Sequence, residues 1–351
     1  MITSRKYKAV GLFSGGLDSL LACRLMSEQN ASVVALHFRL PFVPSGRVAP
    51  SERLRRLAET AGASFVSVEV DDDYLKLVES PPNGYCVHMA PCVDCMIYML
   101  SKARELAREI GAEVVFTGEV VGQRSPGQSK RSLRLIEKEA GLTGRLLRPL
   151  CAKLLEPTIP ELSGIVRRER LLDFCGRGRR RQIRLAHEFA IIDYPSPGNG
   201  CLLSDLSFAI RCRDAIRHGG LSRADVELLK CGRHFRLESG AKVVVGRNQS
   251  ENACLRGLAA VGDLLCYPES AMGPVVLLRA RRITKKDTLT AARICARYCD
   301  GQPGQAVRVV CADKVVSVRP LSEDQAESLQ VRPGFGKLSV ELRSEQEATS
   351  G

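Results

Sequence analysis

The fold of this chain follows from one stretch near its N-terminus, AVGLFSGGLDS over residues 9–19. The apolar run over residues 9–13 predicts a buried strand, and the residues from Ser19 onward predict a helix. The serine and the two glycines between them form the turn. Backbone N–H groups at a helix start make a positive anion site, and glycines let the main chain approach a phosphate without a Cβ in the way. The stretch therefore predicts a phosphate-binding loop.

The polar side chains of this loop suit a nucleotide. Serine hydroxyls donate to phosphate oxygens, and an aspartate holds Mg²⁺. No Gly-Lys-Ser/Thr follows, so this is not the usual phosphate loop. Its place at the first strand-to-helix junction is where open α/β sheets bind ligands. We predict an ATP site with Mg²⁺ near Asp18, formed by Ser14, Gly15, Gly16, Asp18 and Ser19.

Two further positions are predicted to border the adenine and ribose. His37 lies at the end of the next predicted strand, and Gly118 lies where a later strand breaks. His37 equally suits a strand residue with a satisfied backbone contact.

Strands alternate with helical patterns along the first part of the chain, which is typical of βαβ units and a parallel sheet. Five strands are predicted: Tyr7–Phe13, Ser32–Arg39, Phe65–Val70, Glu113–Thr117 and Arg145–Leu147. The predicted fold class is α/β, a parallel five-stranded sheet with helices on both faces, followed by a smaller C-terminal α+β domain. The predicted parts are an ATP-binding domain (1–165), a segment that completes the site (166–220), an α+β domain (221–330) and a polar tail (331–351).

Composition limits the partners. The 351 residues are 44% hydrophobic, which excludes a disordered chain, and no apolar run approaches a bilayer-spanning length. The chain is therefore expected to be cytoplasmic, with no membrane partner. The net charge of +13 predicts a polyanionic partner.

Arginines gather in one segment, residues 167–184. Their guanidinium forks suit phosphates better than lysines do, although such a run also fits a solvated face. We predict that nucleic acid is bound by Arg177, Arg179, Arg180, Arg181 and Arg184.

Fourteen cysteines in a chain of this size that is expected to be cytoplasmic suggest thiol, metal or sulfur chemistry rather than disulfides. Cys92 and Cys95 form a C-x-x-C at a helix start, where the helix dipole lowers thiol pKa, and Cys201 follows a glycine-rich turn. Two interpretations stay open. Either a thiolate carries sulfur as a persulfide that a partner cysteine resolves, or Cys92, Cys95 and Cys201 hold three irons of a 4Fe–4S cluster.

Over residues 6–215, the loop and these cysteines together resemble PP-loop tRNA thiouridine synthases of the adenine nucleotide α-hydrolase type, a HUP-type ATPase fold. One branch has a Pro-x-x-x-Cys at a helix start, matched by Pro91 and Cys95, and a later cysteine matched by Cys201. Cys92 stands where that branch usually has an acidic residue. That branch also commonly has a lysine four or five positions after the helix-start cysteine, whereas this chain has Met99 and Leu100 there.

The resemblance implies an activity, catalytic residues and partners. A uridine carbonyl oxygen of tRNA is adenylated by ATP, with Asp18 holding magnesium, and sulfur on Cys95, Cys201 or the open iron of the cluster displaces AMP. No sulfur-donor segment is present, so an external donor is implied: a cysteine desulfurase, a sulfur carrier or sulfide.

Residues 232–318 resemble the RNA-binding domain of NFACT proteins through VVVGRN over residues 243–248, followed by Glu251 and Asn252. A strand ending in Gly-Arg-Asn also fits a tight turn with an asparagine helix cap.

Two other functions compete with thiolation. An amide-forming ligase with the same loop would adenylate a carboxylate for ammonia transfer, and would need neither the cysteines nor the arginines. An ATP-binding regulator would bind RNA without producing AMP. The intact loop argues against the regulator.

Overall fold

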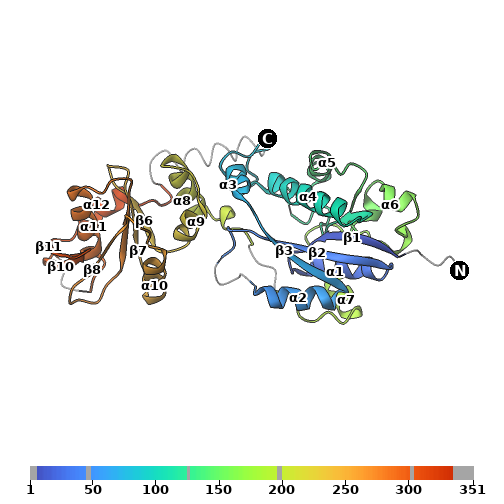
Figure 1. The fold of residues 1–351 in the computed structure, drawn as a ribbon, viewed down its shortest axis with the longest axis horizontal. Helices are drawn as coiled ribbons and strands as arrows, with labels where there is room; N and C mark the ends of the chain where they lie inside the picture. The colour runs from blue at the N-terminus through green and yellow to red at the C-terminus, as the bar shows by residue number, and fades with distance from the viewer. Residues whose placement is uncertain (1–5, 45–48, 125–126, 196–199, 301–303, 335–351) are drawn as a thin grey trace. The chain divides into compact units, whose positions relative to one another are not determined.

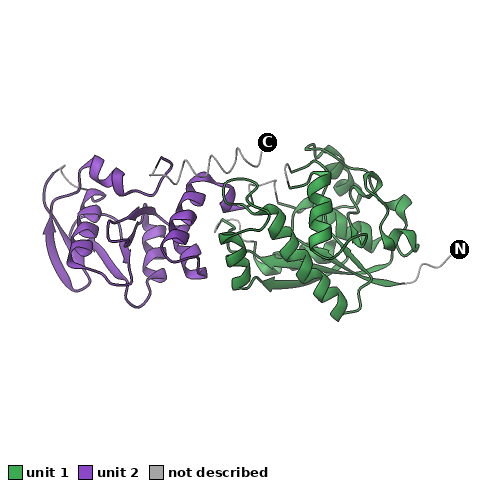
Figure 2. Cartoon of the chain, turned by 90° about the horizontal axis from the view of Figure 1, so that it is seen from above, with its two compact units in different colours: residues 1–200 green, residues 201–351 purple. Residues whose placement is uncertain are grey.

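The computed structural model describes residues 6–44, 49–124, 127–195, 200–300 and 304–334. The chain divides into two compact units, residues 1–200 and 201–351 (Figure 2). The division falls inside the predicted segment 166–220, so its two parts belong to different units. Most of the predicted tail lies outside the described residues. None of the described helices combines the length and the apolar composition that a membrane crossing requires.

The first unit is built on a parallel five-stranded sheet of order β3-β2-β1-β4-β5, as predicted. Its strands are β1 (Tyr7–Leu12), β2 (Ala31–Arg39), β3 (Ala63–Glu69), β4 (Val114–Phe116) and β5 (Leu146–Leu147). Strand β1 pairs on one side with β2, from Tyr7 opposite Ala31, and on the other with β4. The chain order reverses at β1, so the loop after β1 lies at the switch point of the sheet.

Helices cover both faces of this sheet (Figure 1). One face carries α1 (Leu17–Ser27), α2 (Ser51–Thr60) and α7 (Arg180–Glu188). The other carries α3 (Asp72–Glu79), α4 (Cys92–Glu109) and α5 (Lys130–Glu139). A short α6 (Ile159–Leu162) and two 3-10 turns, Ala152–Leu154 and Arg168–Arg170, lie between α5 and α7.

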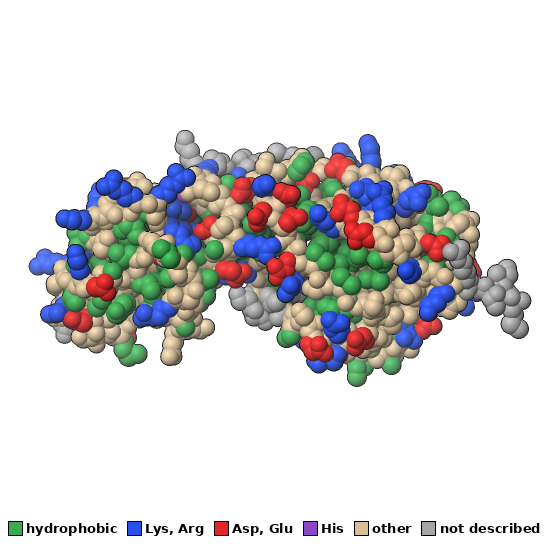
Figure 3. Space-filling view, in the orientation of Figure 1, with side chains coloured by type: hydrophobic (Ala, Val, Ile, Leu, Met, Phe, Trp, Pro, Cys, Tyr) green, Lys and Arg blue, Asp and Glu red, His purple; other side chains and the backbone are tan. Residues whose placement is uncertain are grey.

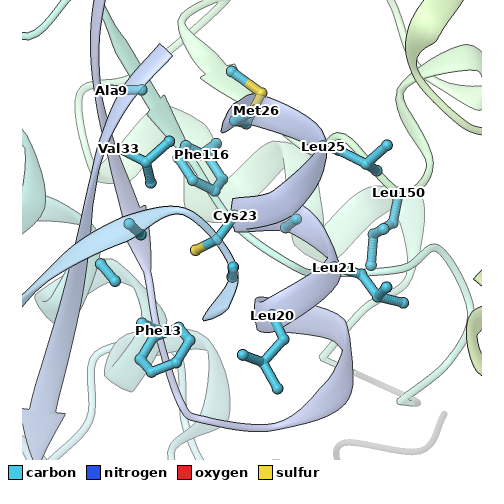
Figure 4. Packing of buried hydrophobic residues seen from close by; sticks show 14 of the residues in the cluster. Ala9, Phe13, Leu20, Leu21, Cys23, Leu25, Met26, Val33, Phe116 and Leu150 are labelled. Carbon is cyan, nitrogen blue, oxygen red and sulfur yellow. The ribbon is translucent and has the colours of Figure 1, made fainter. Parts of the chain in front are cut away.

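Helix α1 is held by its apolar side chains. Leu20 and Cys23 point toward the strands, while Leu21 lies beside Leu150 (Figure 4). Cys23 is fully buried in this cluster and is a core residue. Because α1 is fixed along its length, the loop at its start is held in place.

The sequence pattern predicts that Asp71–Asp73 ends the third strand, that a long loop through Gly84 follows, and that a helix runs from about Cys95 to Ile110. Two boundaries in the structure differ from this prediction. Residues 72–79 form a helix where a loop was expected, because the Asp71 carboxylate accepts a hydrogen bond from the Tyr74 N–H and caps the helix. Helix α4 begins at Cys92 rather than near Cys95. Both cysteines of the C-x-x-C therefore lie in its first turn.

The second unit contains an antiparallel sheet of order β11-β10-β8-β9-β7-β6. Its strands are β6 (Arg233–Arg236), β7 (Lys242–Val245), β8 (Leu264–Pro268), β9 (Val276–Arg279), β10 (Val307–Cys311) and β11 (Lys314–Val318). Its helices are the 3-10 turn Leu202–Ser204, α8 (Leu206–Arg217), α9 (Arg223–Leu229), α10 (Gln249–Leu258), α11 (Lys285–Arg297) and α12 (Glu323–Leu329). The predicted α+β unit is therefore confirmed.

Strand β7 shows why this sheet is buried on both faces. Val243 and Val245 pack into the cluster under α11, while Val244 packs with Leu255 of α10 on the opposite face. Successive strand residues point to opposite faces, so the run of valines needs two apolar layers.

Candidate active site

The loop after β1 folds around the start of α1 through its own hydroxyls. The Ser14 and Ser19 hydroxyls lie 3.3 Å apart, and the Ser19 hydroxyl donates to the Gly16 carbonyl at 2.8 Å. The Gly16 N–H donates to the Ser14 hydroxyl at 3.3 Å. Gly15 has a φ of 75°, a left-handed backbone that favours glycine. The loop thus brings two hydroxyls and the positive helix end together, as an anion site requires.

The Asp18 side chain is held by two residues from distant parts of the chain. Its Oδ2 accepts hydrogen bonds from Gln123 Nε2 at 2.7 Å and from the Arg179 guanidinium at 3.1 Å. Its Oδ1 is buried and has no hydrogen-bond partner among the described residues. A buried carboxylate oxygen without a partner, beside a phosphate-binding loop, fits a Mg²⁺ ligand.

Gly118 lies against the same turn. A Cβ at this position would lie 2.6 Å from the Asp18 carbonyl oxygen and 2.8 Å from the Ser19 nitrogen. Both are backbone atoms, so glycine is needed for the end of β4 to approach α1 this closely. Gly118 therefore supports the loop from the neighbouring strand.

Glu119, the next residue, is turned into the protein. Its carboxylate accepts hydrogen bonds from Arg148 at 3.1 Å and from Thr117 at 3.0 Å, and all three side chains are buried. Arg148 also contacts Glu137 at 3.1 Å. Glu119 therefore fixes the end of β4 internally.

The first part of the arginine segment joins the nucleotide site. The Gly176 N–H donates to the Val121 carbonyl at 2.8 Å, and Gln182 donates to Gln123 at 3.2 Å. These contacts hold residues 175–182 against a second glycine-rich loop, whose described residues are 122–124 and 127–128, and they carry Arg179 to Asp18. Sequence reasoning placed Arg179 among the RNA-binding arginines and missed this contact.

The other four arginines differ from Arg179. Arg177, Arg180 and Arg184 are exposed. Arg181 pairs with Asp173 and lies over the Phe174 ring, 4.4 Å from its centroid. Their predicted RNA contacts stay a prediction.

His37 makes a backbone contact, as expected for a strand residue. Its Nδ1 lies 2.9 Å from the Phe13 carbonyl oxygen, and burial lowers the pKa of the imidazole. The ring also packs near Phe65. The neutral ring thus ties the ends of β1 and β2 together, and its role toward adenine stays a prediction.

The two cysteines of the C-x-x-C have different partners. The Cys95 sulfur lies 3.3 Å from the Tyr74 hydroxyl of α3. Cys92 is exposed and lies beside the second glycine-rich loop, because a Cβ on Gly127 would be 3.6 Å from the Cys92 Cβ. The C-x-x-C therefore adjoins the loop whose Gln123 contacts Asp18. Lys102, the nearest basic residue after Cys95, lies near Asp71 at 3.6 Å.

Cys86 is the cysteine whose position sequence reasoning did not use. The Cys92 thiol and the backbone N–H groups of Val93 and Cys92 donate to its sulfur, which lowers its pKa to about 6 despite partial burial. Helix starts stabilise thiolates in this way. The signal available in the sequence was the position of Cys86, six residues before the C-x-x-C.

Cys201 is the first residue of the second unit, whereas Cys92 and Cys95 belong to the first unit. Burial raises the pKa of its thiol. Within the part of the chain that the structure describes, no group of three His, Cys, Asp or Glu side chains is arranged to hold a metal ion. The three-cysteine set expected for a cluster includes residues of both units, so it stays a prediction.

The Gly-Arg-Asn segment of the second unit has structural roles. Asn248 caps α10 through the Glu251 N–H, and Arg247 pairs with the Glu251 carboxylate. Asn252 Oδ1 accepts a hydrogen bond from the Val275 N–H at 2.9 Å. The Asn252 side chain also fills the space that a Cβ on Gly246 would need. The motif therefore fixes the turn between β7 and α10.

Two parts of the chain match known families. Residues 4–155 match the family described as thiamine biosynthesis protein (ThiI), and residues 232–329 match the NFACT protein RNA binding domain. The first match includes Cys92 and Cys95, and it ends before the arginine segment and Cys201.

Individual relatives match shorter stretches. The tRNA-specific 2-thiouridylase MnmA of Nitratidesulfovibrio vulgaris is 35% identical over 118 residues, 31% of this chain and 34% of that protein. The probable tRNA sulfurtransferase of Thermus thermophilus is 31% identical over 164 residues, 45% of this chain and 38% of that protein. The chain thus spans little more than a third of the length of these curated relatives.

Among solved structures, a 4-thiouridine synthetase–RNA complex with bound ATP is 22% identical, with a TM-score of 0.36, and the match covers 64% of this chain and 52% of that one. The resemblance predicted from the loop, the cysteines and the Gly-Arg-Asn segment is confirmed over the two matched ranges. The chain therefore joins a region that matches the ThiI family, residues 4–155, to a region that matches the NFACT RNA-binding domain, residues 232–329.

Proposed function

We propose that this protein is an ATP-dependent tRNA sulfurtransferase that adenylates a uridine carbonyl oxygen and replaces it with sulfur. One observation carries the proposal. The loop carboxylate of Asp18, the second glycine-rich loop and the C-x-x-C helix form a continuous set of contacts, through Gln123 and through Gly127 beside Cys92. An ATP-activating loop is thereby coupled to thiols within one unit.

The loop residues divide the activation step between them. Ser14, Ser19 and the start of α1 bind the pyrophosphate, and Gly118 keeps that turn in place. A Mg²⁺ ion on Asp18 would neutralise the phosphate oxygens. Arg179 adds a positive charge where negative charge develops as the uridine oxygen attacks the α-phosphate. Pyrophosphate leaves, and the adenylated base is then open to attack by sulfur.

The tRNA is proposed to bind through the exposed arginines Arg177, Arg180 and Arg184, with Arg181, and through the second unit. On the face shown in Figure 3, Lys and Arg side chains predominate over the second unit, whereas they are interspersed with Asp and Glu over the first. A cytoplasmic location and an external sulfur donor belong to the same proposal.

In the described structure Cys92 contacts Cys86 and Cys95 contacts the Tyr74 hydroxyl, and we base the proposal on the thiol interpretation rather than on the iron–sulfur alternative. We derive no step through a cluster. Anaerobic reconstitution with iron and sulfide tests this point. A visible absorption band that is lost in both Cys95→Ala and Cys201→Ala would establish the cluster instead.

The activity is tested with the purified full chain, ATP, bulk tRNA and a persulfide donor. We expect AMP formation that depends on tRNA, with thiouridine detected by nucleoside mass spectrometry. Asp18→Asn should abolish ATP–pyrophosphate exchange. Formation of AMP with a carboxylate and ammonia but without tRNA would establish an amide ligase. Tight RNA binding without AMP would establish a regulator.

A further inference from the structure

We propose that Cys86 and Cys92 form the dithiol pair that carries sulfur to the adenylated base and then releases it. This inference rests on the proposed thiolation, and it assigns the sulfur chemistry to a pair within the first unit. Sequence reasoning assigned these roles to Cys95 and Cys201. The structure brings a different cysteine to the start of α4.

The backbone before α4 returns Cys86 to the helix start. The Cys86 N–H donates to the Ala90 carbonyl at 2.9 Å, and the Ala90 N–H donates to the Val87 carbonyl at 2.8 Å. This tight turn sets the Cys86 sulfur against the first residues of α4, where the Cys92 thiol and the Val93 N–H donate to it. Two sulfurs joined by a hydrogen bond, on a turn of this size, are positioned to form a disulfide.

The pair is accessible and adjoins the nucleotide site. Cys92 is exposed and Cys86 is partly exposed, so an external donor can reach them. Cys92 lies beside Gly127, in the glycine-rich loop that also supplies Gln123 to Asp18. By contrast, Cys95 is turned to the Tyr74 hydroxyl, and Cys201 belongs to the second unit, where burial raises the pKa of its thiol.

The proposed sulfur transfer requires one persulfide donor and one dithiol reductant for each thiouridine formed. A persulfide donor places a sulfane sulfur on Cys86. The terminal sulfur attacks the adenylated carbon, AMP leaves with the bonding electron pair, and the base is joined to Cys86 by a disulfide bond. The Cys92 thiolate attacks the Cys86 sulfur and breaks that bond, so the base keeps the sulfur as a thiocarbonyl. The sulfane sulfur is reduced, two thiols are oxidised to a Cys86–Cys92 disulfide, and an external dithiol restores them.

The decisive variant is Cys92→Ser in the full chain. Without the resolving thiol, the base should remain attached to Cys86, so tRNA is trapped covalently on the protein and is released by dithiothreitol. Cys86→Ser should trap no tRNA and form no thiouridine. ATP–pyrophosphate exchange, measured with tRNA and without a sulfur donor, should continue in both variants, because adenylation precedes the sulfur step. Cys175→Ser, which changes another exposed cysteine of the same unit, is the matched control and should behave like wild type.

Peptide mapping separates this inference from the proposed function. After treatment with a cysteine desulfurase and cysteine, alkylation and mass spectrometry should find the persulfide on Cys86. After a single turnover without reductant, a Cys86–Cys92 disulfide should accompany each thiouridine. Thiouridine formed with the persulfide on Cys95 or a Cys95–Cys201 disulfide would overturn the pair and leave the function standing. A persulfide on Cys86 without any thiouridine would overturn the function.

Discussion

The Arg179 guanidinium donates a hydrogen bond to Asp18 at 3.1 Å, across 161 residues of sequence. Both side chains are mostly buried, and Asp18 also receives the Gln123 amide. This contact separates Arg179 from the four other arginines predicted to bind RNA, because Arg179 alone of the five reaches the phosphate loop in the described structure. Within the arginine segment, Arg179 therefore belongs to the nucleotide site, whereas Arg177, Arg180 and Arg184 are exposed.

Replacing Arg179 should damage ATP use more than tRNA binding. A hydrogen bond to a charged group contributes about 1.5–3 kcal/mol, so Arg179→Ala should slow ATP–pyrophosphate exchange by about tenfold to a hundredfold. Arg184→Ala, an exposed arginine on α7, is the matched control. It should leave exchange unchanged and reduce the salt dependence of tRNA binding. Equal effects of the two variants on exchange would contradict the division of the segment.

A methyl group at Gly118 should displace the phosphate loop. The Cβ of Gly118→Ala would lie 2.6 Å from the Asp18 carbonyl oxygen, so the backbone of α1 or of the strand end has to move. Overpacking of this kind costs about 1–3 kcal/mol, and ATP binding measured by calorimetry should weaken strongly. Gly178→Ala meets no atom within 4 Å and should bind ATP normally. Normal ATP binding by Gly118→Ala would show that the strand end does not support the loop.

The buried Arg148 should be needed for stability. Arg148→Met leaves the Glu119 carboxylate buried without its charge partner, which costs about 3–5 kcal/mol. Urea unfolding followed by circular dichroism should show the loss. Arg53→Met breaks an exposed ion pair with Asp193, at 2.8 Å, and should change the free energy of unfolding by less than about 1 kcal/mol. Similar losses in the two variants would mean that burial of the Arg148 network is not the cause.

His234 should make the second unit sensitive to acid. Its ring is buried, Nε2 lies 2.7 Å from the Cys231 carbonyl oxygen, and burial lowers the imidazole pKa well below 6.5. Below pH 6.5 the unfolded chain therefore binds a proton that the folded chain does not, so the free energy of unfolding falls as the pH falls.

The test compares wild type with His234→Gln in urea unfolding at several pH values. The difference between their free energies of unfolding should change below pH 6.5 by up to about 1.4 kcal/mol per pH unit, and should be constant above neutrality. Parallel pH dependences in the two proteins would rule out His234 as the source.

Local sequence signals were sufficient for much of the fold. The strand ending in Ser14-Gly15-Gly16 and the alternation of strands and helices predicted the parallel sheet, because period and turn residues are local properties. Helix α3 was missed although Asp71 and the acids after it are a helix-start pattern. The same aspartates also fit the end of a strand followed by a loop, and the sequence pattern does not distinguish the two.

The contacts of the site could not be predicted in this way. Nothing local distinguishes Arg179 from Arg180, or Glu119 from a solvated loop glutamate. Cys86 gains its thiol partner from a turn that the sequence pattern did not reveal. These assignments depend on which side chains the packed sheet and its helices bring within hydrogen-bond distance.

The sequence by itself therefore determined the nucleotide loop, the parallel sheet and the presence of a thiol pair at a helix start, since each depends on neighbouring residues. The tertiary structure decided which arginine meets Asp18, which glutamate is buried by Arg148 and which cysteine meets Cys92. These contacts join residues that are far apart in the sequence or that lie on either side of a tight turn. The packing of the whole domain determines which side chains meet.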